Sequence, residues 1–134
     1  MTSSATEVST DAMVVTWHRA ARLASIRYTP GASLAGAEAS VLIEALRGWL
    51  GATREPFAIL ADAKGVRNAD AAYRATTTKF YKEYRDELYI ALFNIGPLIR
   101  VMAEMFRIGS GLQVKAFGNE EDARAWLRGK GIAA

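Results

Sequence analysis

The pattern of hydrophobic and polar residues divides the chain into short apolar runs and longer amphipathic stretches. Residues 13–18 and 22–28 are rich in β-branched and aromatic side chains and are joined by a short turn, which predicts an antiparallel hairpin. Residues 57–61 and 88–94 are almost continuously apolar, as is typical of strands that are buried on both faces. A last apolar run over residues 112–117 completes a set of five predicted strands.

Amphipathic stretches lie between and after these runs, and each of them predicts a helix. The first covers residues 34–50, with Ser33 placed to cap it and Gly51 placed to end it. Its apolar positions recur at helical spacing: Ala37, Val41, Ile43, Leu46 and Leu50.

The second predicted helix covers residues 69–87. Asn68 is a suitable N-cap, and Asp70 falls in the first turn, where a negative charge suits the helix dipole. The apolar stripe of this helix consists of four residues: Tyr73, Thr77, Phe80 and Tyr84. Tyr81 lies off this stripe, which favours an exposed aromatic anchor for a partner.

The third and fourth predicted helices complete the chain. The third begins at Gly96 and Pro97, because proline is well placed in a first turn. Within it, Arg100 and Glu104 have the spacing of an i,i+4 ion pair. The fourth is capped by Asn119, and its first turn is acidic.

The predicted order of elements is β-β-α-β-α-β-α-β-α. Alternating strands and helices predict a single α/β domain, with a five-stranded, mixed and mostly parallel sheet and four helices. Residues 1–12 are small and polar, which predicts a flexible N-terminal tail, and residues 13–134 form the predicted domain.

Composition excludes several classes of function. The chain lacks cysteine and has one histidine, His18, so thiolate chemistry is excluded and a zinc site or another metal site is not expected. The net charge of +3 comes without a Lys/Arg-rich run, so nucleic acid is not an expected partner. No stretch is apolar enough for a membrane span, and residues 1–12 lack the apolar core of a signal peptide, which predicts a cytoplasmic protein.

The candidate functional residues gather around the strand over residues 57–61 and the polar turn after it. In parallel sheets, ligands and partners bind at the carboxyl ends of such strands. The same reasoning includes the start of the third helix. The candidate partner- or ligand-binding residues are Asp62, Lys64, Gly65, Arg67, Asp70, Arg74, Gly96 and Arg100.

Alternatives remain for most of these residues. Asp62 and Asp70 form either an acid–base pair or, as we favour, a turn former and a helix-start charge. Lys64, Arg67 and Arg74 either hold an anion or form the rim of a partner surface. Phe80, Met102, Met105 and Phe106 either line an apolar pocket or simply fill the core. His18 is expected on an edge strand, without a catalytic role.

Three features occur in a characteristic order: the turn Asp62-Ala-Lys-Gly65-Val66, the helix start at Gly96-Pro97, and the terminal Ala123-Arg-Ala-Trp126-Leu127. This order resembles the SpoIIAA-like fold of the STAS domains, and most closely the bacterial STAS/SEC14 domain-containing proteins. Regulatory STAS proteins carry a phosphorylated serine just after an Asp at this helix start. Here Asp70 is followed by Ala71 and Ala72, so the acceptor hydroxyl is missing. The sequence leaves open whether Thr76, Thr77 or Thr78 is phosphorylated.

The resemblance implies a non-enzymatic regulatory or scaffolding module, without a cofactor, that binds another protein and that is compatible with a homodimer. The alternative is a SEC14-like carrier of a lipid or a small apolar ligand, with a pocket between the sheet and the second and third helices. A hydrolase or transferase is the least favoured function, because the chain has one histidine and no cysteine.

Overall fold

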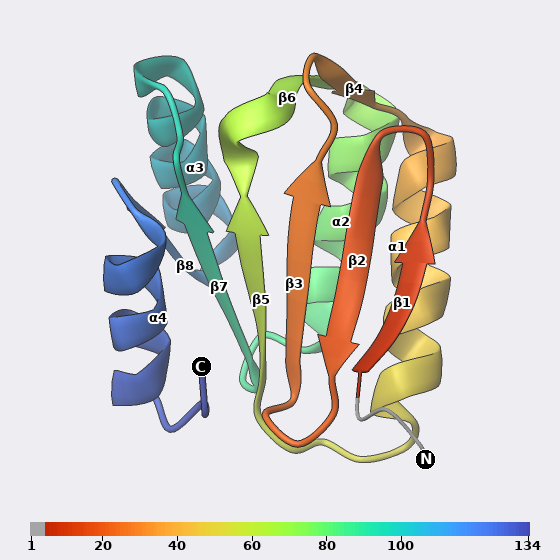
Figure 1. The fold of residues 1–134 in the computed structure, drawn as a ribbon, viewed down its shortest axis with the longest axis vertical. Coiled ribbons are helices and arrows are strands. Elements are labelled where there is room, and N and C mark those ends of the chain that lie inside the picture. Colours follow the sequence, from red (N-terminus) through yellow and green to blue (C-terminus); the bar gives the residue numbers. More distant parts are fainter. Residues whose placement is uncertain (1–4) are drawn as a thin grey trace.

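The computed structural model describes residues 5–134, apart from the side chains of residues 5, 98, 99, 101, 102, 105 and 106. Its main sheet has six strands in the order β1-β2-β3-β5-β7-β8 (Figure 1). The first three strands pair antiparallel, and β3, β5, β7 and β8 run parallel. Their bounds are β1 (Ala5–Ser9), β2 (Met13–His18), β3 (Leu23–Tyr28), β5 (Phe57–Asp62), β7 (Leu88–Phe93) and β8 (Gln113–Phe117).

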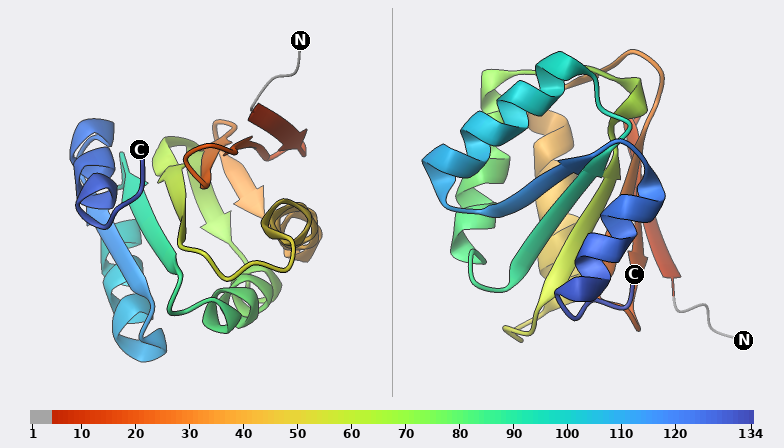
Figure 2. Two further views of the ribbon diagram at one scale, coloured as in Figure 1. Left: turned by 90° about the horizontal axis from the view of Figure 1, so that it is seen from below. Right: turned by 90° about the vertical axis from the view of Figure 1, so that its left-hand side faces the viewer.

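Four helices cover the sheet unequally. Helices α1, α2 and α3 lie on one face, as right-handed crossovers between parallel strands require, and α4 lies on the other face (Figure 2). The four are α1 (Gly36–Leu50), α2 (Ala71–Glu83), α3 (Pro97–Ser110) and α4 (Glu120–Gly129). This arrangement confirms the predicted mixed α/β domain with a mostly parallel sheet. In the described part of the chain, no helix is both long and apolar enough to cross a membrane.

Part of the predicted N-terminal tail is a strand. Strand β1 pairs with β2 over its whole length and makes the sheet six-stranded rather than five-stranded. Val8 of β1 is half-buried and packs against the main core. The stretch is too short and too polar for its alternation to predict a strand, and the exposed edge of β2 recruits it. Residues 1–4 of the predicted tail lie outside the described residues.

A second small ribbon follows the carboxyl ends of the central strands. Strand β4 (Ala32–Leu34) pairs in parallel with β6 (Val66–Ala69), and the short 3₁₀ helix η1 (Ala63–Gly65) connects β5 to β6. The ribbon lies above the sheet between the ends of β3 and β5 and the start of α2 (Figure 1).

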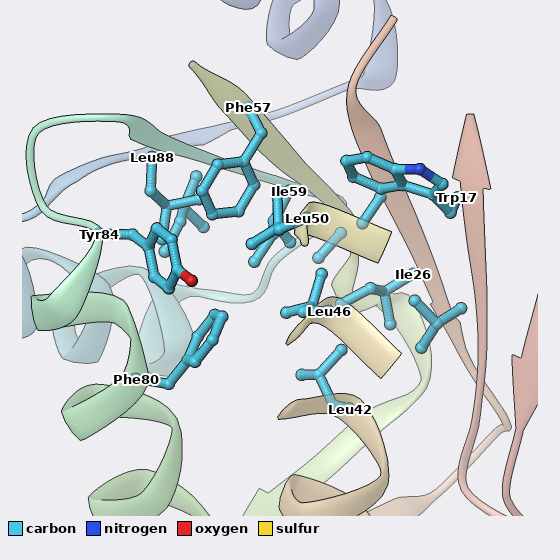
Figure 3. Packing of buried hydrophobic residues seen from close by; sticks show 14 of the residues in the cluster. Trp17, Ile26, Leu42, Leu46, Leu50, Phe57, Ile59, Phe80, Tyr84 and Leu88 are labelled. Carbon is cyan, nitrogen blue, oxygen red and sulfur yellow. The ribbon is translucent and has the colours of Figure 1, made fainter. Parts of the chain in front are cut away.

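The main core fills the space between the sheet and helices α1 and α2. Phe57 and Tyr84 meet edge to face there, with ring centroids 5.5 Å apart (Figure 3). Trp17 stacks on Trp49, with ring centroids 5.8 Å apart. Leu42 of α1 is fully buried, whereas Ala37 is exposed. The predicted apolar stripe of this helix is therefore wrong at Ala37, whereas Leu46 and Leu50 are buried as predicted.

The helix caps differ in part from the predicted ones. Helix α1 begins after Ala35 rather than Ser33, and Glu38 accepts a hydrogen bond of 2.8 Å from the Ala35 N–H. Asn68 lies in β6 and not at a helix start. Asn119 is the predicted N-cap of α4, since its side-chain oxygen accepts from the Asp122 N–H at 2.9 Å.

The predicted ion pair between Arg100 and Glu104 is replaced by another pair on α3. Glu104 pairs with Arg107, with 3.0 Å between the nitrogen and the oxygen. Arg100 instead donates to the Ala116 carbonyl of β8 at 3.5 Å. Spacings of three and four residues both place side chains on one helix face, so sequence spacing does not distinguish between these partners.

Candidate functional site

Asp62 ends the central strand β5 and organises the turn that follows it. One oxygen of its carboxylate accepts hydrogen bonds from the Lys64 N–H at 3.0 Å and from the Asn94 side chain at 3.2 Å. Because Asn94 follows β7, the ends of two neighbouring strands are tied together here. The structure thus gives Asp62 the turn-forming role that the sequence favoured.

Gly65 lies where the turn passes closest to the end of β3. A Cβ atom at this position would lie 2.6 Å from the Thr29 carbonyl oxygen and 2.7 Å from that of Tyr28. Both distances are shorter than a side chain tolerates, so glycine is required for the backbones to approach. Its place in the candidate site is explained by packing.

Asp70 is the N-cap of α2 itself. Its carboxylate accepts from the Tyr73 N–H at 2.8 Å, which satisfies one of the free amide groups of the first turn. Asp62 and Asp70 accept from different donors and share no hydrogen bond. Ala71 and Ala72, where regulatory STAS proteins carry serines, are exposed.

The basic candidates lie on the surface around this helix start. Lys64, Arg67 and Arg74 are exposed, and Arg74 donates to the Asp70 carbonyl at 3.4 Å. Gly96 is the N-cap of α3 and is exposed, as is Arg100. Within the described residues, no group of three or more His, Cys, Asp or Glu side chains is placed to hold a metal ion.

A cavity of about 240 Å³ lies beneath α2, between the sheet and the small ribbon. Its floor is aliphatic and includes Ile26, Ile59, Ile90 and Val114, one side chain from each of the four parallel strands. The ribbon contributes further apolar side chains, and Ala103 of α3 also lines the cavity. This space lies between the sheet and the second and third helices, where the sequence analysis expected a pocket.

Three tyrosines line this largely apolar cavity: Tyr28 of β3, and Tyr73 and Tyr81 of α2. Burial raises the pKa of Tyr73 to about 12 and raises the pKa values of Tyr28 and Tyr81 well above the usual value. The hydroxyls of Tyr28 and Tyr73 also interact, which raises the pKa of Tyr28 and lowers that of Tyr73.

The rest of the α2 wall is made by threonines and one arginine. Thr77 is buried, and its hydroxyl donates to the Tyr73 carbonyl at 2.9 Å, within the helix. Thr78 also lines the cavity, as does Arg74 at the helix start. Arg74 is exposed, so the cavity has a charged group at its rim.

Among the described residues, no side chain of the predicted apolar pocket lines this cavity. Phe80 is not among the lining residues but belongs to the main core, where Arg47 stacks over its ring at 4.9 Å. The side chains of Met102, Met105 and Phe106 lie outside the described residues. Tyr81 is half-buried and lines the cavity, where the sequence analysis expected an exposed anchor.

One signal in the sequence points to the cavity wall. Tyr73, Thr77 and Tyr81 are spaced four residues apart, so they lie along one face of α2. Read as a separate stripe, they indicate a face with hydroxyl groups beside the face of Phe80 and Tyr84. The predicted stripe instead combined Tyr73 and Thr77 with Phe80 and Tyr84 and left Tyr81 outside it.

His18 lies on β2, which β1 covers, so it is not on an edge strand as the sequence analysis expected. Its Nε2 atom lies 3.0 Å from the Ser25 hydroxyl on the neighbouring strand β3. Both side chains are half-buried and project from the face of the sheet that α4 partly covers.

Comparisons with known proteins show which solved structures have a similar fold. No model of a protein family matches the chain, and no curated protein matches it. A protein of the DUF3478 family with a SpoIIAA-like fold from Shewanella loihica PV-4 is 14% identical, with a TM-score of 0.66, and the match covers 95% of this chain and 98% of that one. Apo-SiaC from Pseudomonas aeruginosa is 11% identical, with a TM-score of 0.61 over 85% of this chain and 98% of that one. The chain therefore has the SpoIIAA-like fold that its sequence predicted.

Proposed function

We propose that this protein is a non-enzymatic regulatory module that binds a small, largely apolar molecule in the cavity beneath α2. The observation that carries the proposal is the cavity itself, an aliphatic space of about 240 Å³ with three tyrosines in its wall. The SpoIIAA-like fold is compatible with a regulatory module.

An apolar occupant suits the chemistry of this space. An empty aliphatic cavity forfeits the dispersion contacts that close packing supplies elsewhere, and few polar groups reach into it to hold water. A ligand with an apolar body restores those contacts. The floor of the cavity consists of side chains of the main core, which include Ile26 and Ile59.

The tyrosine hydroxyls determine which polar groups a ligand needs. The three tyrosine hydroxyls are protonated at neutral pH, and burial raises their pKa values further, so a hydroxyl that is not engaged by another tyrosine can donate a hydrogen bond to a ligand. A ligand with one acceptor oxygen near these hydroxyls is therefore preferred over a pure hydrocarbon. Arg74 at the rim favours a neutral or negatively charged end over a positive one.

Consecutive threonines of α2 provide a matched test. Thr78 lines the cavity, whereas Thr76 is half-buried but does not line it. Binding of the neutral apolar fluorophore N-phenyl-1-naphthylamine is measured for wild type, Thr78→Phe and Thr76→Phe. We expect about tenfold weaker binding for Thr78→Phe, because the phenyl ring fills the cavity, and little change for Thr76→Phe. Equal binding by all three proteins contradicts the proposal.

The natural ligand is sought separately. Native mass spectrometry of protein purified gently from its own host reports the mass of a co-purifying small molecule. A lipid-like mass that Thr78→Phe abolishes supports a carrier of apolar ligands. A mass that both variants retain places that molecule elsewhere on the protein.

A second candidate function is contact with another protein through the surface around the start of α2. The observation that favours it is the group of exposed cations, Lys64, Arg67 and Arg74, around the helix start. Arg74 also lines the cavity, so occupancy of the cavity is positioned to alter this surface. Arg67 does not line the cavity, so the charge reversal Arg67→Glu tests the surface alone. It should weaken binding of a partner protein at least as much as raised ionic strength weakens it for wild type. Fluorophore binding should remain unchanged.

A homodimer through the same surface is tested by the same variant. Sedimentation of wild type and Arg67→Glu over a range of concentrations gives the oligomeric state directly. A dimer that persists in Arg67→Glu uses another surface.

A further inference from the structure

A second hollow, separate from the cavity, lies on the opposite face of the sheet. Helix α4 packs on β5, β7 and β8, and beside it a groove of about 330 Å³ runs over β2 and β3. Side chains alternate along a strand, so Ile26 points toward α2 while Ser25 and Arg27 point into the groove. What the groove binds is therefore independent of the proposed function.

Hydroxyl groups line the middle of the groove. Thr16 and Ser25 are register partners on β2 and β3, so their side chains stand next to each other. The His18 ring lies 3.0 Å from the Ser25 hydroxyl and fixes its orientation. These groups offer short, positioned hydrogen bonds to a polar ligand.

Two side chains of opposite charge lie beside these hydroxyls. Arg27 and Asp62 are register partners on the parallel strands β3 and β5, and both line the groove. Within the described residues, neither of them forms an ion pair. The two hydrogen bonds that Asp62 accepts, from Lys64 and Asn94, both use its Oδ1 atom, which leaves Oδ2 for a ligand.

The remaining charged pair closes the side of the groove. Arg124 and Glu120 of α4 are joined by an ion pair of 2.7 Å, so they neutralise each other. Leu60 and Phe93 are almost fully buried and form an apolar part of the lining. The groove thus combines one unpaired cation, one unpaired anion and an apolar surface.

We propose that this groove binds a small zwitterion of the α-amino acid type. Its carboxylate contacts the Arg27 guanidinium and the hydroxyls of Ser25 and Thr16, and its ammonium group contacts Oδ2 of Asp62. Its side chain lies toward Phe93.

The balance of charge selects a zwitterion over simpler ions. A plain carboxylate at Arg27 is repelled by Asp62, and a plain amine at Asp62 is repelled by Arg27. Neighbouring strands are about 4.8 Å apart, so register partners place the Arg27 and Asp62 side chains side by side, where one small molecule can contact both. The volume of the groove falls within the usual range for small-molecule sites.

Two-dimensional NMR of the full chain, titrated with each of the common amino acids, tests the proposal. We expect shifts of the Thr16, Ser25 and Asp62 amides for at least one amino acid, and about tenfold weaker binding for its N-acetyl derivative and for the amine that lacks the carboxylate. Arg27→Gln and Asp62→Asn should each weaken binding by about the same factor, since each removes one charge. Arg67→Gln, on an exposed residue outside the groove, is the matched control.

Three outcomes overturn the proposal. The first is the absence of shifts in the groove at about 10 mM of every amino acid. The second is equal binding of acetate, which shows a simple anion site. The third is undiminished binding by Arg27→Gln and Asp62→Asn that remain folded by the same spectra. Thr78→Phe, which blocks the cavity beneath α2, should leave amino acid binding unchanged, so the two proposals fail separately.

Discussion

The Asp70 carboxylate accepts a hydrogen bond of 2.8 Å from the backbone N–H of Tyr73, so the residue that caps α2 also fixes the first tyrosine of the cavity wall. The Asp70 N–H in turn donates to the Leu34 carbonyl of β4 at 2.9 Å. Because Leu34 lines the same cavity, this one residue joins the ribbon, the helix start and the cavity.

Replacing Asp70 by alanine should therefore lower the free energy of unfolding by about 1 kcal/mol, the usual cost of losing an N-cap. Asp70→Asn retains an acceptor oxygen and should cost much less. Urea unfolding of both variants measures the difference. Equal stability of Asp70→Ala and wild type means that the cap does not stabilise α2.

Gly65→Ala should be among the more destabilising single substitutions on the surface of this protein. The added Cβ meets the backbone carbonyls of Thr29 and Tyr28, which cannot rotate away as a side chain does. We expect a loss of about 1–3 kcal/mol in the free energy of unfolding.

Gly48 supplies the control for that substitution. It lies inside α1, and a Cβ there meets no atom within 4 Å. Gly48→Ala should therefore stabilise the protein by up to about 1 kcal/mol, through helix propensity alone. Thermal unfolding of the two variants should shift in opposite directions, and a downward shift for both contradicts the steric explanation for Gly65.

The raised pKa values of the buried tyrosines lead us to expect that the protein is less stable at alkaline pH. Burial raises the pKa of Tyr73 from 10.0 to about 12, so the unfolded chain releases this proton at lower pH than the folded protein does. The contribution of Tyr73 to stability is then complete below about pH 10 and is lost as the pH rises toward about 12. Tyr28 and Tyr81 act in the same direction.

Urea unfolding measured between about pH 8 and 11 checks this dependence. Above the pKa of tyrosine in the unfolded chain, each buried tyrosine lowers the free energy of unfolding by at most about 1.4 kcal/mol per pH unit. Tyr73→Phe removes one ionisable group and should make the decline shallower. An unchanged slope in that variant shows that Tyr73 ionises equally easily in both states.

The order of elements and the fold follow from local pattern, because apolar runs, caps and turns each depend on residues close in sequence. Asn119 and the Gly96-Pro97 helix start were predicted for this reason. Strand β1 was not predicted, because its stability comes from pairing with β2 and not from its own residues. Whether Ala37 or Leu42 of α1 faces the core likewise depends on what the helix packs against, since both belong to apolar spacings.

The cavity depends on contacts that no local pattern contains. Its lining comes from strands, ribbon and helices that are distant in the sequence, and only the spacing of Tyr73, Thr77 and Tyr81 marks it. The groove beside α4 depends on strand register, which brings Arg27 next to Asp62. The positions of Asp62 at the end of β5 and of Arg74 at the start of α2 were predictable, because the carboxyl ends of parallel strands and the helix starts that follow them are recognisable locally.

Phe80 of α2 belongs to the main core and allows a final prediction. Its side chain is 1% exposed and contacts the rings of Tyr81 and Tyr84, but it does not line the cavity. Phe80→Ala should lower the free energy of unfolding by about 3–5 kcal/mol, while Phe80→Leu, which keeps most of the volume, should cost far less. Because Phe80→Leu leaves the cavity wall in place, it should bind N-phenyl-1-naphthylamine as wild type does. Strongly weakened binding in the folded Phe80→Leu protein would place Phe80 in the ligand site after all, as the sequence analysis allowed.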